Sequence, residues 1–332
     1  VVELIGAISG GLIIWYGGNK ALEGVLTVGI LVSFIQYSEM FFRPIRDLSE
    51  KYNIMQTAMA SSERIFKLMD RKPAISDAEK PLELQECLGN IEFKNVWFAY
   101  TKDNYVLKNI SFNIQQGEKV AFVGATGAGK SSIMNLLCRF YDIQQGEILI
   151  DGLNIKDIRQ NDLRRNIGLV VQDIFLFSDS ISNNISLNNN EITRDKILDS
   201  AKIIGIDGFI ERLPLGYEQN VKERGVTLSQ GQRQLITFAR ALAYDPKILI
   251  LDEATSSVDT LSEILIQKAI DKLMEGRTSI IIAHRLSTIQ KCDKIIVMHK
   301  GEIRETGTHQ ELLEFGGIYS KLYQLQYKES LA

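Results

Sequence analysis

Residues 124–131 have the spacing of a loop that binds phosphate groups. The fixed positions of the pattern (glycine, four residues, glycine, lysine, serine) are filled by Gly124, Gly129, Lys130 and Ser131. The apolar run Val120–Val123 before the loop predicts a strand, and Ser132–Phe140 after it predicts a helix, which is the context that such a loop requires. An accidental glycine-rich turn is not expected to have both neighbours. The pattern therefore predicts an α/β protein that binds a nucleoside triphosphate.

Glycines let backbone N–H groups close around phosphate oxygens, and the start of the following helix adds positive potential. Lys130 is expected to reach the β- and γ-phosphates, and the Ser131 hydroxyl to be a ligand of Mg²⁺. Most of the other positions need only their backbone groups. We therefore expect ATP to contact the whole loop and the residue after it: Gly124, Ala125, Thr126, Gly127, Ala128, Gly129, Lys130, Ser131 and Ser132.

Two carboxylates follow a second apolar run. Ile248–Leu251 predicts a buried strand, and Asp252 and Glu253 come directly after it, at the edge where ligands of open α/β sheets bind. Asp252 is expected to hold hydrated Mg²⁺, and Glu253 to orient and polarise the attacking water. A strand with a solvated acidic end is the alternative, and the phosphate loop argues against it.

Short apolar runs continue from Ile91 to Met298, and the later ones alternate with helical stretches. Continuous apolar strands between helices are typical of a mostly parallel sheet that is covered on both faces. These runs are Ile91–Phe93, Val96–Tyr100, Ile110–Ile114, Val120–Val123, Ile148–Ile150, Ile167–Val171, Ile248–Leu251, Ser279–Ala283 and Lys294–Met298.

The N-terminal part of the chain has a different composition. Residues 1–42 are apolar and nearly uncharged, whereas the whole 332-residue chain has 45% hydrophobic and 24% charged residues, as globular proteins do. Val1–Tyr16 is slightly short for a membrane span, and Val25–Ile45 has roughly the 20 residues that a span needs. Two transmembrane helices are therefore expected, joined by a turn over Gly17–Gly24. Basic residues directly after the second helix place that end in the cytoplasm.

The second helix is expected to continue beyond the membrane, to kink at Pro44 and to end at Asp70. Glu39 is expected either to face a pathway or a partner helix, or to lie solvated at the membrane surface. The predicted organisation is a partial transmembrane domain over 1–70, a charged linker over 71–88 and a nucleotide-binding domain over 89–332.

The charge and the cysteines exclude some functions. The net charge is −3 and no basic block stands out, so a nucleic-acid partner is not expected. Cys87, Cys138 and Cys292 lie far apart without metal-ligand spacing, which indicates reduced thiols in a cytoplasmic domain.

A third motif, Leu228–Gln232, precedes the apolar helix predicted over Leu235–Ala243. Its residues are leucine, serine, glutamine, glycine and glutamine, and in isolation they could be a polar helix cap. Between the first two motifs, however, they resemble the signature of the ATP-binding cassette (ABC) superfamily. Further motifs occur in that family's order: Tyr100, Gln172, the loop Ser256–Asp259 and His284. The resemblance extends over essentially the whole chain.

The resemblance implies an ABC-type P-loop NTPase fold, with a RecA-like core, an antiparallel β subdomain and an α-helical subdomain, preceded by transmembrane α-helices. It implies that Tyr100 stacks on adenine, that Gln172 binds Mg²⁺ and senses the membrane domain, and that His284 contacts the γ-phosphate. It further implies contacts with ATP bound to a second copy, made by Ser229, Gly231 and Gln232. Lys130, Gln172, Glu253 and His284 would form the catalytic set.

Two positions depart from the family's pattern. Ala125 stands where many relatives have proline, which matters little because only backbone groups act there. In the loop Asn220–Gly225, Lys222 replaces a glycine that is frequent in exporters, while the acidic Glu223 is kept. The second departure concerns coupling to the membrane domain and not hydrolysis.

An exporter half-transporter is the predicted class, because apolar spans precede the cassette in one chain. The predicted partners are a second half-transporter chain (in a homodimer or a heterodimer), the cell membrane and a transported drug, lipid or peptide. One alternative is an ABC ATPase that acts on chromosomes, but only about a hundred residues separate Lys130 from Ser229 and leave no room for long coiled coils. The other alternative is an importer subunit, whose cassette is a separate soluble chain.

Overall fold

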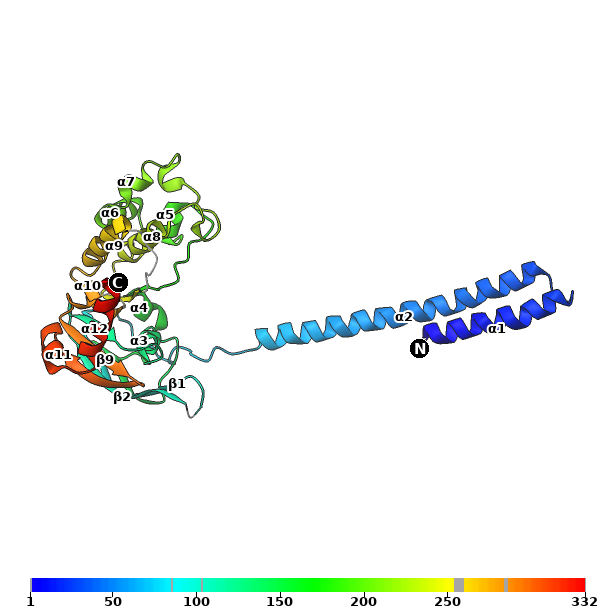
Figure 1. Cartoon of the computed structure of the whole chain (residues 1–332), viewed down its shortest axis with the longest axis horizontal. Helices are drawn as coiled ribbons and strands as arrows, with labels where there is room; N and C mark the ends of the chain where they lie inside the picture. Colours follow the sequence, from blue (N-terminus) through cyan, green and yellow to red (C-terminus); the bar gives the residue numbers. More distant parts are fainter. Residues whose placement is uncertain (1, 85, 103, 254–259, 284–285, 332) are drawn as a thin grey trace. The chain divides into compact units, whose positions relative to one another are not determined.

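The computed structural model describes residues 2–84, 86–102, 104–253, 260–283 and 286–331. The chain divides into two compact units, Val1–Ala74 and Ile75–Ala332 (Figure 1). The first unit is a pair of helices, and the second contains two sheets and the remaining helices.

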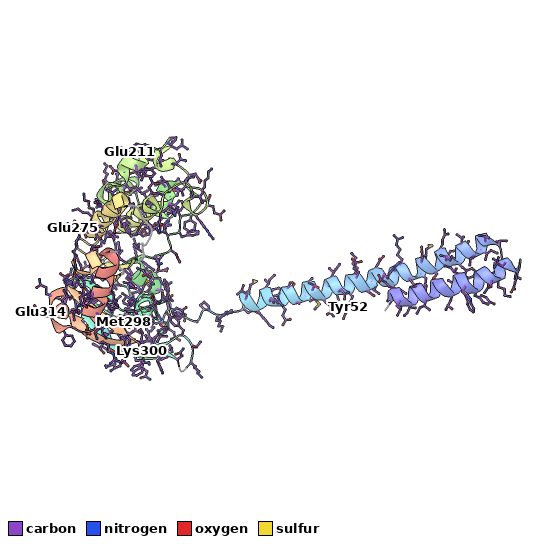
Figure 2. All side chains as sticks on the ribbon, viewed as in Figure 1. Tyr52, Glu211, Glu275, Met298, Lys300 and Glu314 are labelled. Atoms are coloured by element: carbon purple, nitrogen blue, oxygen red, sulfur yellow. The ribbon has the colours of Figure 1, made fainter. Side chains whose placement is uncertain are left out.

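The first unit consists of α1 (Val2–Leu22) and α2 (Val28–Met69), which pack against each other. Thr27 caps α2 by accepting a hydrogen bond from the Ile30 backbone N–H, and the helix runs through Pro44 without interruption. All residues of α2 are described and none is buried; the Tyr52 side chain, for example, is exposed (Figure 2). Among the helices in the described parts of the chain, none is both long enough and apolar enough to cross a membrane.

The turn predicted over Gly17–Gly24 is wrong, because α1 continues to Leu22 and the chain turns over residues 23–27. Glycine usually breaks a helix, but here its missing side chain is what allows the two helices to approach. A Cβ atom on Gly17 would lie 2.6 Å from Cδ1 of Leu31 on α2. Gly24, with φ of +75°, does stand in the turn.

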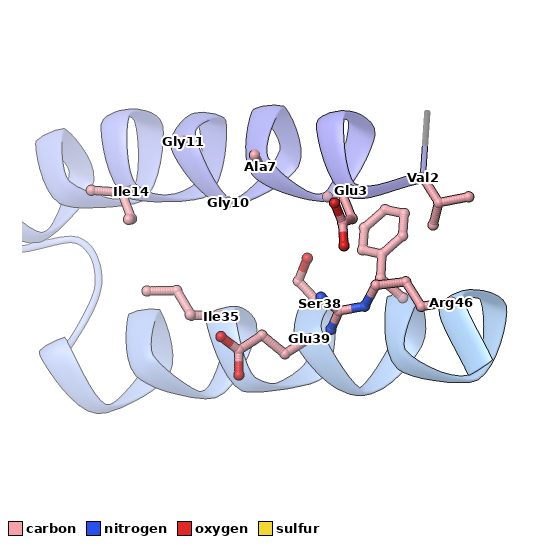
Figure 3. Close-up of a pocket in the computed structure, with 12 residues that line it drawn as sticks. Val2, Glu3, Ala7, Gly10, Gly11, Ile14, Ile35, Ser38, Glu39 and Arg46 are labelled. Carbon is pink, nitrogen blue, oxygen red and sulfur yellow. The ribbon is translucent and has the colours of Figure 1, made fainter. Parts of the chain in front are cut away.

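A cleft of 580 Å³ opens between the two helices of this unit (Figure 3). Gly10 and Gly11 line it from α1, and Ser38 and Glu39 line it from α2. The glycines leave space opposite the polar side chains, because nothing lies within 4 Å of a Cβ built on either of them.

The larger sheet of the second unit has six strands in the order β10-β9-β3-β8-β7-β6. Neighbouring strands are parallel except for β10, which pairs antiparallel with β9. The strands are β3 (Lys119–Val123), β6 (Ile167–Val170), β7 (Ile248–Glu253), β8 (Thr278–Ala283), β9 (Lys294–His299) and β10 (Glu302–Gly307). The mostly parallel sheet predicted from the apolar runs is therefore present.

The smaller sheet is antiparallel, in the order β2-β1-β4-β5. Its strands are β1 (Ile91–Ala99), β2 (Tyr105–Ile114), β4 (Gln145–Ile150) and β5 (Leu153–Asn154). Two separate strands were predicted within β1. They form one strand because a bulge absorbs the irregularity: the register shifts between Phe93 and Val96, where Asn95 has φ of +49°.

Helices cover the larger sheet, and α5 to α9 gather at one end of the second unit (Figure 1). The helices are α3 (Lys130–Leu137), α4 (Gln160–Arg165), α5 (Ile181–Ser186), α6 (Arg194–Ile204), α7 (Asp207–Ile210), α8 (Gln230–Ala243), α9 (Thr260–Leu273), α10 (Leu286–Ile289), α11 (His309–Phe315) and α12 (Ile318–Leu331), with short 3₁₀ turns at Gly216–Glu218 and Glu223–Gly225.

Alternate residues of each central strand belong to opposite cores. In β3, Val120 and Phe122 pack in the core shared with the antiparallel sheet and α3, whereas Ala121 and Val123 pack in the core shared with helices such as α8 and α9. Side chains of successive strand residues point to opposite faces. Strands that are covered on both faces must therefore be apolar throughout.

Candidate functional site

The loop between β3 and α3 has a backbone that only glycine can adopt at two positions. Gly124 has φ of +156°, and a Cβ on it would lie 2.2 Å from the carbonyl oxygen of Met298. Gly129 has φ of +104° and caps α3, and its Cβ would lie 2.6 Å from Cδ2 of Leu107. Both glycines bring the loop backbone against neighbouring strands. This close packing gives the loop its fixed shape.

Lys130 is buried at the start of α3 and turns back onto the loop. Its Nζ donates to the carbonyl oxygens of Gly124 at 2.7 Å and Ala125 at 3.1 Å. Burial lowers the pKa of Lys130 from its usual value, and the nearby Asp252 carboxylate partly opposes this shift. The ammonium group is thus held over the loop, where a phosphate oxygen could take the place of a carbonyl.

A cleft of 520 Å³ lies over the loop and collects residues from distant parts of the sequence. The predicted site residues that line it are Tyr100, Thr126, Gly127, Gly129, Lys130, Ser131, Ser132, Gln172 and Asp252. They meet because β3, β7 and β6 are connected through parallel pairing, which brings the carboxyl ends of the strands to one edge of the sheet. Val106 and Ile282 also line the cleft and were not predicted.

Tyr100 directly follows β1 and is held by polar and aromatic neighbours. Its hydroxyl lies 3.2 Å from Oγ of Ser132 and accepts a hydrogen bond of 3.1 Å from Nδ2 of Asn135. Its ring contacts those of Phe98 and Tyr141 edge to face, with centroids 4.7 Å and 4.9 Å away. The side chain is still 45% exposed, so a fixed aromatic surface faces the cleft region.

Asn135 was missed in the sequence, although a signal existed. It lies three residues after Ser132 on α3, and residues at that spacing share one face of a helix. Because Ser132 was predicted to contact ATP, the same face of α3 could have been searched for side chains that support the site.

Part of the predicted catalytic set lies outside the described residues. Glu253 ends β7, where its backbone pairs with that of Ala283 in β8, but its side chain is not among those described. His284 and the loop Ser256–Asp259 also lie outside the described residues. Gln172 follows β6 and is exposed, and Asp252 is partly buried. The catalytic roles given to these residues stay predictions.

Ser229, Gly231 and Gln232 do not line the cleft but form the start of α8. The Ser229 hydroxyl accepts from the backbone N–H of Gln232 at 3.2 Å, and Oε1 of Gln232 accepts from the backbone N–H of Ser229 at 2.9 Å. This reciprocal capping box satisfies two backbone donors that the helix leaves free. The polar helix cap that the sequence offered as an alternative is thus present. It does not conflict with contacts from these residues to a second copy.

The residues around the cleft fit MgATP by their chemistry. No group of three His, Cys, Asp or Glu side chains that could hold a metal ion exists among the described residues. Mg²⁺ differs from zinc in preferring oxygen ligands, few of them from protein and the rest from phosphate and water. Among the residues that line the cleft, Ser131 offers a hydroxyl, Gln172 an amide and Asp252 a carboxylate. That donor set suits Mg²⁺ held mainly by nucleotide phosphates.

Comparison with known proteins finds relatives that are named as ABC transporters. The ABC transporter family pattern matches residues 107–256. A probable multidrug resistance ABC transporter ATP-binding/permease protein of Bacillus subtilis is 46% identical over 95% of this chain and 47% of its own length. An ATP-dependent lipid A-core flippase of Syntrophus aciditrophicus is 44% identical over 99% of this chain and 54% of its own. The chain thus spans about half the length of the curated relatives it matches.

A solved structure of a bacterial Atm1-family ABC exporter with ATP bound is similar in fold as well as sequence. It matches with a TM-score of 0.75 and 38% identity, over 98% of this chain and 56% of the exporter chain. The order of motifs, the geometry of the phosphate loop and these relatives agree: the chain belongs to the ABC transporter family.

Proposed function

We propose that this chain is the ATP-hydrolysing motor of an exporter half-transporter. The observation that carries the proposal is the cleft in which Lys130 and Ser131 of the phosphate loop meet Asp252 and Gln172. Relatives named as an ATP-binding/permease protein and a lipid flippase support the transport role.

In this proposal the loop 124–132 holds the phosphates of ATP, and Tyr100 stacks on adenine. Ser131, Gln172 and Asp252 would hold Mg²⁺, which neutralises charge on the phosphate oxygens. Lys130 would bind the β- and γ-phosphates, Glu253 would orient the attacking water and accept its proton, and His284 would donate to the γ-phosphate. The rigid loop serves this chemistry because its N–H groups need no reorganisation when phosphate charge is transferred.

Two copies would share each ATP. Ser229, Gly231 and Gln232 lie away from the cleft of their own chain, at the start of the fourteen-residue helix α8. A helix N-terminus attracts anions, so these residues of one protomer would close over the γ-phosphate bound by the other. The second protomer is either an identical chain or a different half-transporter.

We further propose that residues 1–70 belong to a membrane domain, that 71–88 link it to the cassette and that 89–332 form the cytoplasmic nucleotide-binding domain of a cell-membrane protein. Large apolar side chains exposed along α1 and α2, among them Leu12, Trp15 and Phe34, support this assignment. The cargo would be a drug, lipid or peptide. ATP-driven closure of the two cassettes, hydrolysis and reopening would move the membrane helices through α2 and the Gln172 loop.

Substitution of the proposed water-orienting carboxylate tests the motor. Glu253→Gln is expected to bind ATP as the parent does and to lose about 10²- to 10⁴-fold in hydrolysis rate. The control is Glu275→Gln, which makes the same change on an exposed residue that pairs with Lys272 and is expected to leave hydrolysis unchanged. Undiminished hydrolysis in Glu253→Gln would falsify the catalytic assignment.

Membrane extraction tests the exporter class separately. A half-transporter is expected to stay with the membrane fraction in high salt and to need detergent for release, because its apolar helices lie in lipid. A chain released by high salt alone would favour the alternative classes with soluble cassettes.

A further inference from the structure

The side chain of Arg139 is buried just beyond the end of α3, and each of its three guanidinium nitrogens donates a hydrogen bond. Only 4% of the residue is exposed. Its Nε donates to Asp142 Oδ1 at 3.3 Å, its Nη1 to the Ile158 carbonyl at 3.4 Å and its Nη2 to the Ser76 carbonyl at 3.1 Å. A buried guanidinium is costly unless it is paired and hydrogen-bonded. These three contacts therefore fix the positions of the groups around it.

The backbone of Arg139 is itself unusual, because its φ is +50°, in the left-handed region. That conformation disfavours residues with a Cβ and persists only where surrounding contacts determine it. Arg164 supplies such contacts: its guanidinium donates to the carbonyls of Cys138 and Arg139 at 3.2 Å and 3.0 Å. The turn after α3 is thus held in one shape.

The Ser76 contact matters because Ser76 lies at the beginning of the second unit, a few residues after α2 ends at Met69. We call residues 75–84 the connecting segment. It is tied to the cassette at further points: Leu82 exchanges backbone hydrogen bonds with Asp157 and Arg159, at 2.7 Å and 3.0 Å. Leu84 is buried in the core that includes β1 and α3.

Asp77 of the connecting segment caps the helix α4, although it lies far from that helix in the sequence. Its Oδ1 accepts a hydrogen bond of 2.9 Å from the backbone N–H of Gln160, the first residue of α4. Arg159, at the N-cap position, makes no side-chain cap of its own. The bond from the Gln160 backbone lowers the pKa of Asp77, so the carboxylate stays charged and suits the positive end of the helix.

These contacts join the connecting segment to the two helices that lead to the nucleotide cleft, α3 and α4. The helix α3 has eight residues, about 12 Å, from Lys130 of the phosphate loop to Leu137, and Arg139 is the second residue after its end. The helix α4 leads into β6 and then to Gln172. Arg139 bonds to the connecting segment and to Ile158, just before α4, at the same time.

We propose that Arg139 is a positioning residue that ties the connecting segment after α2 to the phosphate-loop helix, so that ATP binding at the cleft is transmitted to α2 by this route. Arg139 is not among the residues that line the nucleotide cleft. The inference rests on the proposed function as an exporter motor. It adds a physical connection that is separate from the Gln172 loop.

The test compares ATP-dependent amide exchange in the connecting segment. The chain, with its membrane portion and its partner protomer, is placed in lipid nanodiscs in the Glu253→Gln background, and exchange of residues 70–84 is measured with and without MgATP. MgATP is expected to slow this exchange, and Arg139→Met is expected to reduce the effect by roughly two- to thirty-fold. Binding of MgATP itself, measured on the same samples, is expected to stay within about twofold of the parent.

A purely structural role gives a different result. It would raise exchange of the segment equally with and without MgATP, which would leave the ATP-dependent difference intact and overturn the proposal. Asp77→Ala removes an exposed cap that holds the same connecting segment to α4, and so tests the anchoring of this segment if Arg139→Met does not fold. It is expected to reduce the difference as well. Arg165→Met is the matched control, because Arg165 is an exposed residue at the end of α4 whose guanidinium pairs with Glu191.

The remaining outcomes separate the two proposals. A parent protein that binds no MgATP contradicts the proposed motor. Two outcomes overturn the route through Arg139 and leave the proposed motor standing. In the first, the parent binds MgATP but amide exchange of residues 70–84 does not change. In the second, the variants at Arg139 and Asp77 keep the full ATP-dependent change in exchange.

Discussion

Replacing Lys222 by glycine should stabilise the cassette. Lys222 has φ of +57° and ψ of −175°, a combination that glycine adopts almost alone, because a Cβ atom there collides with the backbone. Lys222 is exposed, and its backbone N–H donates to Oδ1 of Asn220 at 2.7 Å, a bond that glycine can keep.

The size of the effect follows from two opposing terms. Backbone strain of this kind amounts to about 1–3 kcal/mol, and Lys222→Gly removes it from the folded state. Glycine gives the unfolded chain more freedom, which offsets about 0.5–1 kcal/mol. We expect a net gain of about 1 kcal/mol, or roughly 2–4 °C in the unfolding temperature for a domain of this size.

The measurement can be confined to the second unit by its single tryptophan. The chain has two tryptophans, Trp15 in α1 and Trp97 in β1, so Trp15→Phe leaves Trp97 fluorescence as the probe of cassette unfolding. Lys222→Ala is the control, because it removes the long side chain but keeps the strained Cβ, and it is expected to change stability by under about 0.5 kcal/mol. The reasoning is refuted if Lys222→Gly does not raise the midpoint, or if Lys222→Ala raises it equally.

Two further predictions concern the phosphate loop and acid stability. Gly124→Ala puts a Cβ 2.2 Å from the Met298 carbonyl oxygen, so affinity for a fluorescent ATP analogue should fall at least about tenfold, or about 1.4 kcal/mol. Gly127→Ala is the control: a Cβ there meets open space, so it should lose less affinity. Equal losses of affinity in the two variants would contradict this prediction. Burial raises the pKa of Asp151, but hydrogen bonds from the N–H groups of residues 88–90 outweigh burial and lower it. Its stabilisation is therefore full above the unfolded pKa of about 3.9 and lost as pH falls through the folded value. Asp151→Asn should lower the free energy of unfolding, measured in urea, by about 1–2 kcal/mol at pH 7. The difference between parent and variant should narrow below about pH 4. A difference that does not depend on pH would count against this role of Asp151.

The parallel sheet and the phosphate loop could be predicted because their signals are local. Val120–Val123 is apolar throughout, and the two glycines of the loop stand where the backbone needs them. The turn at Gly17–Gly24 could not be predicted, because local breaking tendency and close helix packing both favour glycine. Only the position of Leu31 on the neighbouring helix decides between them.

The support around the site was harder to predict than the site. Asn135 and Arg139 do not belong to any motif. Their roles depend on contacts that only the fold creates: Asn135 donates to the Tyr100 hydroxyl, and Arg139 donates to the Ser76 carbonyl. The capping box of Ser229 and Gln232 is different. A serine followed three residues later by glutamine before an apolar run is a recognised sign of a helix start, and it could have placed α8 within a residue.

The separation of the cleft from the start of α8 has a thermodynamic consequence for the proposed dimer. If ATP in one cleft gains its contacts with Ser229 and Gly231 only when a second copy docks, ATP binding and dimer formation are coupled by one free energy. ATP that binds tenfold more tightly to the dimer must strengthen the dimer tenfold, which is about 1.4 kcal/mol. Loss of the γ-phosphate removes those contacts, so the same free energy becomes available for opening. In the proposed transporter it can act on the helices α1 and α2 only through parts fixed to the cleft, and the contact of Arg139 with Ser76 provides such a fixed part.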